Sequence, residues 1–185
     1  GLGDVYKRQG ENIIIVTSGA NELVSPAQQR ETVDELRRQG PVPIVLAQGE
    51  LTPEHSAELP KLVANSDSRL VLNLAPVTTR DPELLAAADP LVLNEGEAAA
   101  VLDAAPGTPV EDLIEDLRAT ARSVVVTLGQ RGALILEKDA KPVHIPAVYV
   151  EHVVDTTGAG DAFCGTLAAA LAQGETCLLY TSDAA

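Results

Sequence analysis

The sequence predicts a three-layer α/β protein in which helices cover both faces of a mainly parallel β-sheet. Short runs of aliphatic and β-branched residues alternate with longer segments of helical periodicity along most of the 185 residues. Parallel strands of one sheet are joined by right-handed crossovers that usually contain a helix, so this alternation is typical of such a sheet. Apolar residues make up 45% of the chain, which is sufficient for one hydrophobic core.

The expected strands are short and are bounded by turn-forming residues. The run Ser-Val-Val-Val-Thr-Leu at 123–128 is the strongest strand signal, because β-branched residues favour an extended backbone. A turn with two glycines follows it, so we expect the next strand to pair back as a β-hairpin. In chain order, strands are predicted at 12–17, which we expect to be buried, and at 43–47, 69–74, 91–93, 123–128, 133–137 and 141–146.

Two of the expected helices carry a clear start signal. Ser25 precedes Pro26 and Thr52 precedes Pro53, and a hydroxyl at the N-cap followed by proline is typical of a helix start. The last helix is rich in alanine, whose small side chain allows close packing on a sheet. In chain order, helices are predicted at 26–38, 53–65, 82–88, 97–102, 109–121 and 160–173.

The composition argues against nucleic acid as a partner. The net charge of -14 at pH 7 repels a phosphate backbone, and aromatic residues, on which bases stack, make up only 2% of the chain. A small anion such as a nucleotide is still compatible with this charge, because backbone N–H groups and a metal ion can bind it.

The two cysteines and the hydropathy pattern indicate a cytoplasmic protein. Cys164 and Cys177 form neither a disulfide framework nor a metal-ligand spacing, so we expect two unpaired thiols in a reducing compartment. The sequence also contains no apolar stretch that predicts a membrane span and no signal-peptide pattern. We therefore expect no membrane partner.

The two ends of the sequence do not continue the pattern beside them. Residues 1–9 and 177–185 contain two of the three tyrosines and belong to no expected strand or helix. Our hypothesis is that both are non-native flanks of a truncated reading frame. On this interpretation, residues 10–176 form a partial α/β domain.

A glycine-rich loop precedes the alanine-rich helix and has the features of an anion site. It reads Asp-Thr-Thr-Gly-Ala-Gly-Asp at 155–161. Gly158 and Gly160 allow consecutive N–H groups to turn toward one point, and the helix adds its positive N-terminus. Such a hole suits the charge of a transferring phosphoryl group. Asp161 stands at its mouth, where a carboxylate can accept the proton of an attacking hydroxyl.

Further polar segments lie at the ends of the expected strands, where α/β sheets bind ligands. They comprise 19–21, 48–50, Asn73, 94–97 and 127–132. The carboxyl ends of parallel strands meet at one edge of the sheet. We therefore expect these segments and the glycine-rich loop to form one site.

The string Asp-Thr-Thr-Gly-Ala-Gly-Asp-Ala-Phe-Cys-Gly resembles the C-terminal signature of the ribokinase-like (PfkB-type) carbohydrate kinases. The resemblance covers nearly all of residues 10–173. Asn-Leu-Ala-Pro at 73–76 is similar to the family's Asn-Pro-Ala-Pro, although Leu74 replaces a proline. Residues 94–97 match its Asn-x-x-Glu motif, and 127–132 match its Thr-Leu-Gly-x-x-Gly nucleotide loop. Within the family, Ser-Gly-Ala-Asn at 18–21 is most similar to ribokinases.

The resemblance implies a truncated ribokinase-like fold and ATP-dependent phosphorylation of a sugar hydroxyl, with ribose favoured. It implies that Asp161 is the base and contacts both sugar and ATP, and that Glu50 contacts the sugar. The implied anion hole consists of Gly158, Ala159 and Gly160. Mg²⁺ would be associated with Glu97, and an activating K⁺ with Asp155 and Thr157. The implied ATP-binding residues are Asn94, Thr127, Leu128, Gly129, Gln130, Arg131, Gly132, Gly160 and Asp161.

Three alternatives stay open at this point. Fructose, 2-keto-3-deoxygluconate and nucleosides are other substrates of the same family. A nicotinamide-dependent oxidoreductase would require a Gly-x-Gly-x-x-Gly motif between an early strand and helix, which the sequence lacks, as it lacks a Walker A motif. A catalytically incompetent binding module is the third alternative, because the resemblance covers neither the family's N-terminal sugar-binding part nor its C-terminal helices. Dimerisation is expected only of a full-length protein.

Overall fold

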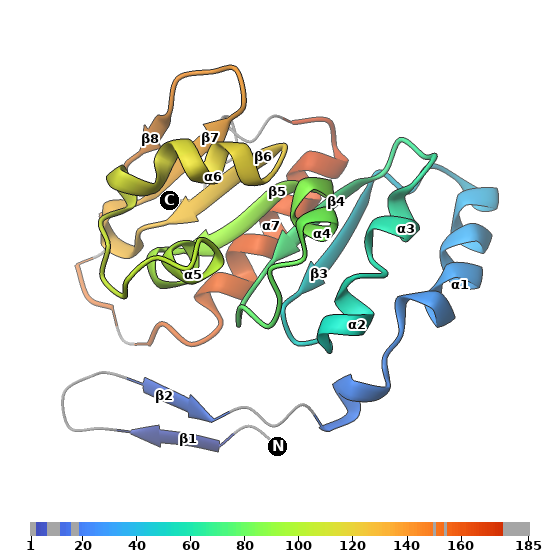
Figure 1. Ribbon diagram of the computed structural model, residues 1–185, viewed down its shortest axis with the longest axis horizontal. Helices are drawn as coiled ribbons and strands as arrows, with labels where there is room; N and C mark the ends of the chain where they lie inside the picture. The colour runs from blue at the N-terminus through green and yellow to red at the C-terminus, as the bar shows by residue number, and fades with distance from the viewer. Residues whose placement is uncertain (1–2, 7–11, 16–18, 150, 154, 176–185) are drawn as a thin grey trace.

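The computed structural model describes residues 3–6, 12–15, 19–149, 151–153 and 155–175. Within them, six strands form one sheet in the order β3-β4-β5-β6-β7-β8 (Figure 1). Strands β3 to β6 are parallel, whereas β7 and β8 are each antiparallel to the preceding strand. The predicted mainly parallel α/β sheet with its terminal hairpin is confirmed. The strands are β3 (Ile44–Gln48), β4 (Arg69–Asn73), β5 (Ala88–Asn94), β6 (Ser123–Thr127), β7 (Ala133–Glu137) and β8 (Val143–Ile145).

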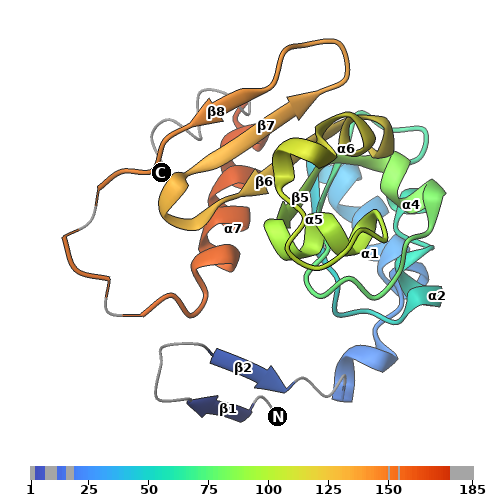
Figure 2. The same ribbon diagram turned by 60° about the vertical axis from the view of Figure 1, so that its left-hand side comes forward.

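Helices cover both faces of this sheet (Figures 1 and 2). Helix α7 (Ala159–Ala172) packs on one face, and most of the other helices pack on the opposite face. Helix α1 (Pro26–Gln39) lies at the β3 end and contacts α3. The helices of the opposite face are α2 (Pro53–Ser56), α3 (Pro60–Val63), α4 (Pro82–Ala87), α5 (Glu95–Val101) and α6 (Ile114–Thr120), together with the 3₁₀ turn η2 (Val110–Leu113).

The period-two alternation of the strands divides the core between the two faces. On β4, Leu70 and Leu72 pack with the α2–α6 layer, whereas Val71 packs with α7. Strand β6 repeats this arrangement, with Val125 on the α7 side. Successive side chains of a strand point to opposite faces, so a strand buried on both sides is apolar throughout. This is why the run at 123–128 was such a strong strand signal.

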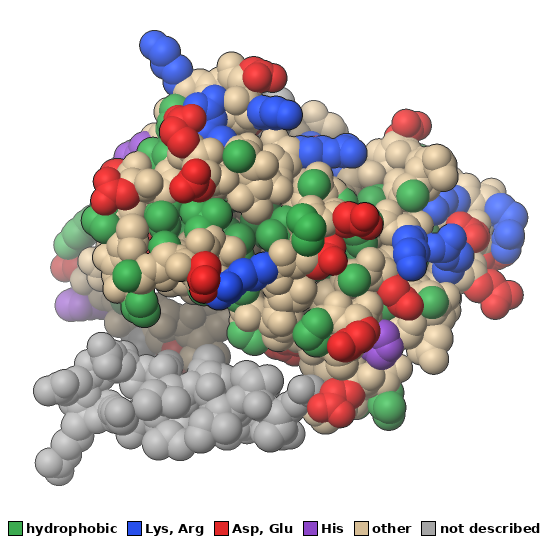
Figure 3. Space-filling view, in the orientation of Figure 1, with side chains coloured by type: hydrophobic (Ala, Val, Ile, Leu, Met, Phe, Trp, Pro, Cys, Tyr) green, Lys and Arg blue, Asp and Glu red, His purple; other side chains and the backbone are tan. Residues whose placement is uncertain are grey.

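Both predicted helix caps are present. Ser25 Oγ accepts a hydrogen bond from the Ala27 N–H at 3.2 Å, and Thr52 Oγ1 accepts one from the His55 N–H at 3.2 Å. Each cap satisfies an N–H group that has no partner inside the helix. Acidic and basic side chains lie side by side over α1 (Figure 3). Two ion pairs join residues three apart on this helix, Asp34 with Arg37 and Glu35 with Arg38.

Two predicted helices are interrupted. The helix expected at 53–65 is divided into α2 and α3, because Pro60 has no N–H to donate and its ring clashes with the preceding turn. Pro60 instead begins α3 at the first helical position. The helix expected at 109–121 begins as the 3₁₀ turn η2 before it continues as α6.

Two strands also differ from their predictions. Strand β5 begins at Ala88 and includes Pro90, and the β4–β5 register shifts between Leu70 and Leu72. This irregularity accommodates a residue that cannot donate a ladder hydrogen bond. Strand β2 (Asn12–Ile15) pairs with β1 (Gly3–Tyr6) in a separate antiparallel sheet. The prediction of a strand there is confirmed for 12–15, and this strand lies in a sheet separate from the six-stranded one. A β-branched run predicts extended backbone without specifying the partner strand.

The structure describes only part of the two chain ends. Residues 177–185, predicted to be a flank, lie outside the described part of the chain, and residues 1–9 contain β1. Of the helices that the structure describes, none combines the length and the apolarity that crossing a bilayer requires.

Candidate active site

The carboxyl ends of the four parallel strands meet at one edge of the sheet. Gln48, Asn73, Asn94 and Thr127 are the last residues of β3, β4, β5 and β6. Gln48 pairs with Asn73, and Asn94 pairs with Thr127, across the parallel ladder. The polar residues predicted at strand ends are therefore neighbours in space. The N-terminus of α7 lies beside them.

A cavity of about 160 Å³ forms between these strand ends and α7. Among its lining residues, the sequence had predicted Asn94, Glu97, Thr127, Gly158, Gly160 and Asp161 as site residues. The cavity thus joins the glycine-rich loop to the Asn-x-x-Glu motif, which are about 60 residues apart in the chain. No lysine or arginine lines this cavity among the described residues. A polyanion would therefore depend on backbone N–H groups and on a cation for its neutralisation.

The glycine-rich loop forms the start of α7 without a side-chain cap. Gly158 is the N-cap and has a φ of 75°, in the left-handed region that glycine tolerates. Since glycine has no side chain to accept from the helix, the first-turn N–H groups of Gly160 and Asp161 are available to an anion. The Ala159 N–H is already engaged, because it donates to the Thr156 carbonyl at 3.1 Å.

Asp161 lies in the first turn of α7 and is exposed. Its Oδ1 accepts a hydrogen bond of 2.6 Å from Gln48 Nε2. Oδ2 has no hydrogen-bond partner in the part of the chain that the structure describes. The carboxylate therefore has one oxygen held by an amide and one oxygen available to accept a proton.

Asp155 and Thr157 stabilise the first turn of the glycine-rich loop. Asp155 Oδ1 accepts hydrogen bonds from the Thr157 N–H and the Thr157 hydroxyl, both at 2.8 Å. These bonds hold the pKa of Asp155 below its usual range, so the carboxyl is ionised. An ionised carboxylate and a hydroxyl are hard oxygen ligands of the kind that a monovalent or divalent cation takes.

Asn94 and Glu97 form a capping box at the start of α5. Asn94 Oδ1 accepts from the Glu97 N–H at 2.8 Å, and Glu97 Oε2 accepts from the Asn94 N–H at 2.7 Å. The helix therefore begins at Glu95, two residues before its predicted start. Asn94 Nδ2 and Glu97 Oε1 are not used by the box. The Asn-x-x-Glu motif can thus cap the helix and contact a ligand at once.

Burial makes this part of the cavity costly for negative charge. Burial raises the pKa of Glu97, and the hydrogen bond from the Asn94 N–H offsets only part of the rise. Cys164 also lines the cavity, and burial together with the charges of Asp161 and Glu97 raises the pKa of its thiol to about 11. Cys164 is therefore a neutral thiol in this site rather than a nucleophile.

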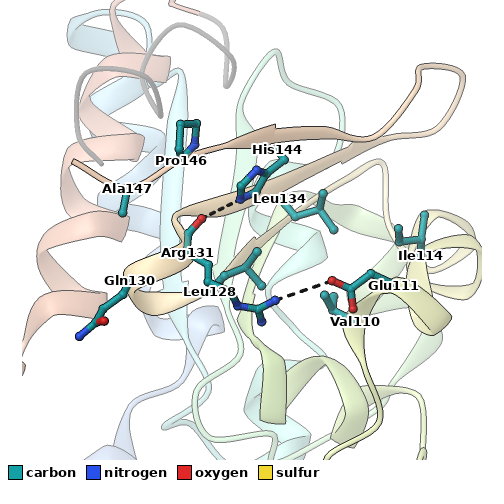
Figure 4. Close-up of a pocket in the computed structure, with 10 residues that line it drawn as sticks. All are labelled: Val110, Glu111, Ile114, Leu128, Gln130, Arg131, Leu134, His144, Pro146 and Ala147. Carbon is teal, nitrogen blue, oxygen red and sulfur yellow. Dashed lines mark hydrogen bonds and ion pairs between the residues drawn. The ribbon is translucent and has the colours of Figure 1, made fainter. Parts of the chain in front are cut away.

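The predicted nucleotide loop is divided between two cavities. Thr127 lines the cavity beside α7. Leu128, Gln130 and Arg131 line a different cavity of about 500 Å³, between η2, α6 and the β7–β8 hairpin (Figure 4). The fold thus leaves three of the predicted ATP-binding side chains outside the cavity that contains Asp161.

Ion pairs hold the Arg131 side chain away from the glycine-rich loop. The Arg131 guanidinium donates a hydrogen bond to the Glu95 carboxylate. Its Nη1 also lies 3.7 Å from Glu111 Oε1, and Figure 4 shows this ion pair. These carboxylates raise the pKa of Arg131. The His144 ring nitrogen Nε2 lies 2.7 Å from the Arg131 carbonyl oxygen. Arg131 therefore ties the loop to α5, η2 and β8.

Glu50 lies beside the cavity but does not line it. Its carboxylate accepts a hydrogen bond of 2.8 Å from Asn21 Nδ2, and both residues line a neighbouring groove of about 380 Å³ between α1 and β3. The two polar segments 19–21 and 48–50 are thus brought together, and the second contains the predicted sugar contact Glu50. Gln48 links this groove to Asp161.

Six lining residues had no individual role in the sequence prediction: Asn73, Ala75, Val92, Leu93, Phe163 and Cys164. Asn73 is buried and donates to the Val92 carbonyl at 3.2 Å, and Phe163 and Cys164 follow Asp161 on α7. Gln48 and Asn73 belong to the polar strand ends that the sequence placed in the site, but neither was assigned an individual role. The positions of Gln48 and Asn73 at strand ends were a signal in the sequence, but nothing there indicated which side chain each would reach.

An uncapped helix N-terminus beside an aspartate, at the carboxyl edge of an α/β sheet, is an arrangement that can bind an anion such as a phosphoryl group. Residues 4–178 match the family described as pfkB family carbohydrate kinase, which covers more than half of the chain. The chain belongs to the pfkB family of carbohydrate kinases. The resemblance predicted from the glycine-rich loop is therefore confirmed.

Individual relatives are similar over nearly all of the chain. A ribokinase of Bacillus subtilis is 32% identical over 175 residues, covering 95% of this chain and 56% of the relative. A deoxyribokinase of Salmonella typhi is 34% identical over 166 residues, covering 85% of this chain and 51% of the relative. The solved structure of Arabidopsis thaliana ribokinase complexed with ribose and ATP is 26% identical with a TM-score of 0.77, covering 98% and 59%. The chain spans about half the length of the curated relatives it matches.

Proposed function

We propose that this chain carries the catalytic part of an ATP-dependent sugar kinase whose substrate is ribose. The observation that supports this most strongly is the cavity that joins Asp161 and the open N-terminus of α7 to Asn94 and Thr127. The names of the relatives support the sugar, since several are ribokinases and one solved structure holds ribose and ATP. The full length of these relatives leads us to propose that the active form is a longer protein.

In the proposed reaction, Asp161 Oδ2 accepts the proton of the sugar hydroxyl as its oxygen attacks the γ-phosphorus of ATP. The bond from that phosphorus to the bridging oxygen breaks, and ADP leaves with the electron pair. The N–H groups of Gly160 and Asp161 stabilise the charge on the transferring phosphoryl oxygens, with Gly158 and Ala159 shaping the hole. Glu50 contacts the sugar from the neighbouring groove.

The nucleotide is proposed to extend from the hole toward β5 and β6. Asn94 Nδ2 and the Thr127 hydroxyl provide polar contacts, and Gly129 and Gly132 bring the backbone of the loop close. The side chains of Leu128, Gln130 and Arg131 act here by holding the loop in place. This assignment follows the contacts of these residues.

The described residues offer some of the oxygen ligands that the proposed Mg²⁺ and K⁺ would take. Among the described residues, no cluster of three His, Cys, Asp or Glu side chains is arranged to hold a metal. Proteins commonly hold Mg²⁺ by one or two carboxylates together with substrate phosphates. Glu97 is the carboxylate proposed for Mg²⁺, which would neutralise phosphate charge when bound. Asp155 Oδ2 and the Thr157 hydroxyl are proposed for K⁺, where the cation would order the loop.

Asp161→Asn tests the proposed base. In the full-length protein, we expect turnover to fall about 10²- to 10⁴-fold, because the amide cannot accept the hydroxyl proton. The affinity for ATP should be retained, since the backbone hole is unchanged. Turnover is measured by coupled ADP release, and ATP affinity by calorimetric titration. Unchanged turnover would remove Asp161 from the role of base.

A panel of acceptors tests the proposed sugar. The same ADP-release assay is run with ribose, 2-deoxyribose, fructose, 2-keto-3-deoxygluconate and a nucleoside. We expect the highest kcat/KM with ribose. The deoxyribokinase relative makes 2-deoxyribose the second candidate. A higher kcat/KM with any other acceptor would replace ribose without affecting the role of Asp161.

A further inference from the structure

Gln48 contacts the proposed base from a distant part of the chain. It is the last residue of β3 and lies 113 residues before Asp161, yet its Nε2 donates to Asp161 Oδ1 at 2.6 Å. A hydrogen bond from an amide to a carboxylate is charge-assisted and is stronger than one between neutral groups. Gln48 is half-buried between β4 and α7. Asp161 is exposed, so this hydrogen bond lies at the edge of the sheet, where solvent reaches it.

The backbone that carries Gln48 is held firmly. Gln48 pairs with Asn73 in the parallel ladder, and the next N–H, that of Gly49, donates to the Asn73 carbonyl at 2.9 Å. The Thr78 hydroxyl donates to the Gly49 carbonyl at 3.1 Å. A Cβ at Gly49 would lie 2.0 Å from the Pro76 carbonyl oxygen, so the two loops touch directly. The backbone position from which the Gln48 side chain extends is thus set by the sheet and by the adjoining loop.

We propose that Gln48 is a positioning residue that orients the Asp161 carboxylate for proton abstraction. This inference rests on the proposed function, in which Asp161 is the base. By occupying Oδ1, the amide fixes the side chain of Asp161 and leaves Oδ2 to face the sugar hydroxyl. Gln48 itself neither accepts the proton nor touches the phosphoryl group.

The same segment also carries the proposed sugar contact. Glu50 follows Gln48 by two residues and is held by Asn21 in the groove next to the cavity. The loop at 48–50 therefore holds the sugar on one side and the base on the other. A shift of this loop would move the hydroxyl and its acceptor apart, and misplacement by about 1 Å can cost about 10²-fold in rate.

Gln48→Leu tests this inference in the full-length protein. It removes the donor while nearly keeping the side-chain size. We expect kcat with ribose to fall about 10- to 100-fold, with the KM for ATP and the melting temperature unchanged. Gln48→Glu should lower kcat at least as much, because it places a second carboxylate against Asp161. Gln28→Leu on the exposed surface of α1 is the matched control and should leave kcat unchanged.

The outcomes separate this inference from the proposed function. If Asp161→Asn retains turnover, the proposed base is wrong, and the inference is overturned with it. If Asp161→Asn abolishes turnover but Gln48→Leu keeps kcat within about twofold, only the inference is overturned. A fall in kcat that is accompanied by a lower melting temperature or a raised KM for ATP indicates a structural role and also overturns it. In the Asp161→Asn background, Gln48→Leu should cause no further loss of residual turnover.

A direct measurement on the 185-residue chain supplements the kinetics. In ¹⁵N-labelled protein, the Gln48 side-chain amide resonance is assigned by its disappearance in Gln48→Leu. Asp161→Ala should move this resonance because the acceptor is lost. An unmoved resonance would contradict the contact.

Discussion

Glu97 both caps α5 and lines the wall of the cavity. Its Oε2 is used by the Asn94 N–H, and its carboxyl group is partly buried in the wall of the cavity. Burial is the main reason for its raised pKa, since a carboxylate loses hydration there. In the absence of a ligand, ionised Glu97 therefore costs stability. A cation beside it would compensate for this cost.

Glu97→Gln tests whether burial of the ionised Glu97 carboxylate lowers the stability of the fold, because this cost depends on pH. Below the ordinary pKa of 4.5, Glu97 is neutral in both the folded and the unfolded chain and imposes no penalty. As the pH rises through the higher pKa of the folded state, the wild type loses the stability that the bound proton provided. Glutamine can keep the capping box without a charge. The melting temperature of E97Q relative to wild type should therefore rise from below pH 4.5 to neutral pH.

Glu35→Gln provides a control of opposite sign. Hydrogen bonds from Arg38 and Gln39 lower the pKa of Glu35, so its ionisation favours the folded state. That contribution is present above its ordinary pKa and is lost as the pH falls. E35Q should therefore lose melting temperature relative to wild type as the pH rises. If E97Q followed the same direction as E35Q, the assignment of a buried carboxylate cost would be wrong.

At the scale of elements, the β6–β7 hairpin and β8 hold the nucleotide loop. Gly132 immediately precedes β7 and has a φ of 94°, which favours glycine. A Cβ there would lie 1.9 Å from the Ile145 carbonyl oxygen and 2.6 Å from the Ala147 nitrogen. The second glycine of the Thr-Leu-Gly-x-x-Gly motif is therefore required where β8 crosses the loop.

Gly132→Ala should destabilise the chain by about 2–4 kcal/mol, because it combines strained backbone with a clash against backbone atoms. Gly107→Ala is the matched control, since Gly107 has a φ of 82° but no heavy atom within 4 Å of a built Cβ. It should cost only about 1 kcal/mol. Urea unfolding of the chain measures both. Equal losses would show that backbone strain alone requires glycine at 132.

At the scale of the whole molecule, the site is open. All residues from Asp155 to Asp161 are exposed, and Glu50 is exposed as well. The relatives that match are about twice as long as the matched part. Catalytic groups that are not held against an oriented substrate lose most of their effect. We propose that the remainder of a full-length protein covers the sugar and completes the cation site, and that it forms a homodimer.

The isolated 185-residue chain should therefore bind ATP weakly and phosphorylate ribose negligibly. Calorimetric titration with ATP and the ADP-release assay measure these properties. The full-length protein under the same conditions is the positive control. Turnover by the isolated chain at about 1–100 per second, which is ordinary for kinases, would show that these residues suffice.

Features determined by neighbouring residues could be predicted from the sequence. The caps at Ser25 and Thr52, the glycine-rich start of α7 and the strand at 123–128 depend on interactions within a few positions. The family followed from the same kind of signal, because the glycine-rich loop is one contiguous segment. Pro60 also carries a local signal, since proline interrupts a helix wherever the helix is placed, but the prediction of one continuous helix at 53–65 did not use it.

Contacts between distant segments were decided only by the tertiary structure. The hydrogen bond from Gln48 to Asp161, the tether of Arg131 to Glu95 and the pairing of β2 outside the main sheet join residues that have no local signal for each other. Strand order and side-chain reach determine such contacts, and both result from packing the whole core. The sequence by itself therefore determined the fold class, the family and the loop beside α7. The tertiary structure decided which side chains that loop meets, because side-chain chemistry specifies what a residue can bind and the fold specifies what lies within reach.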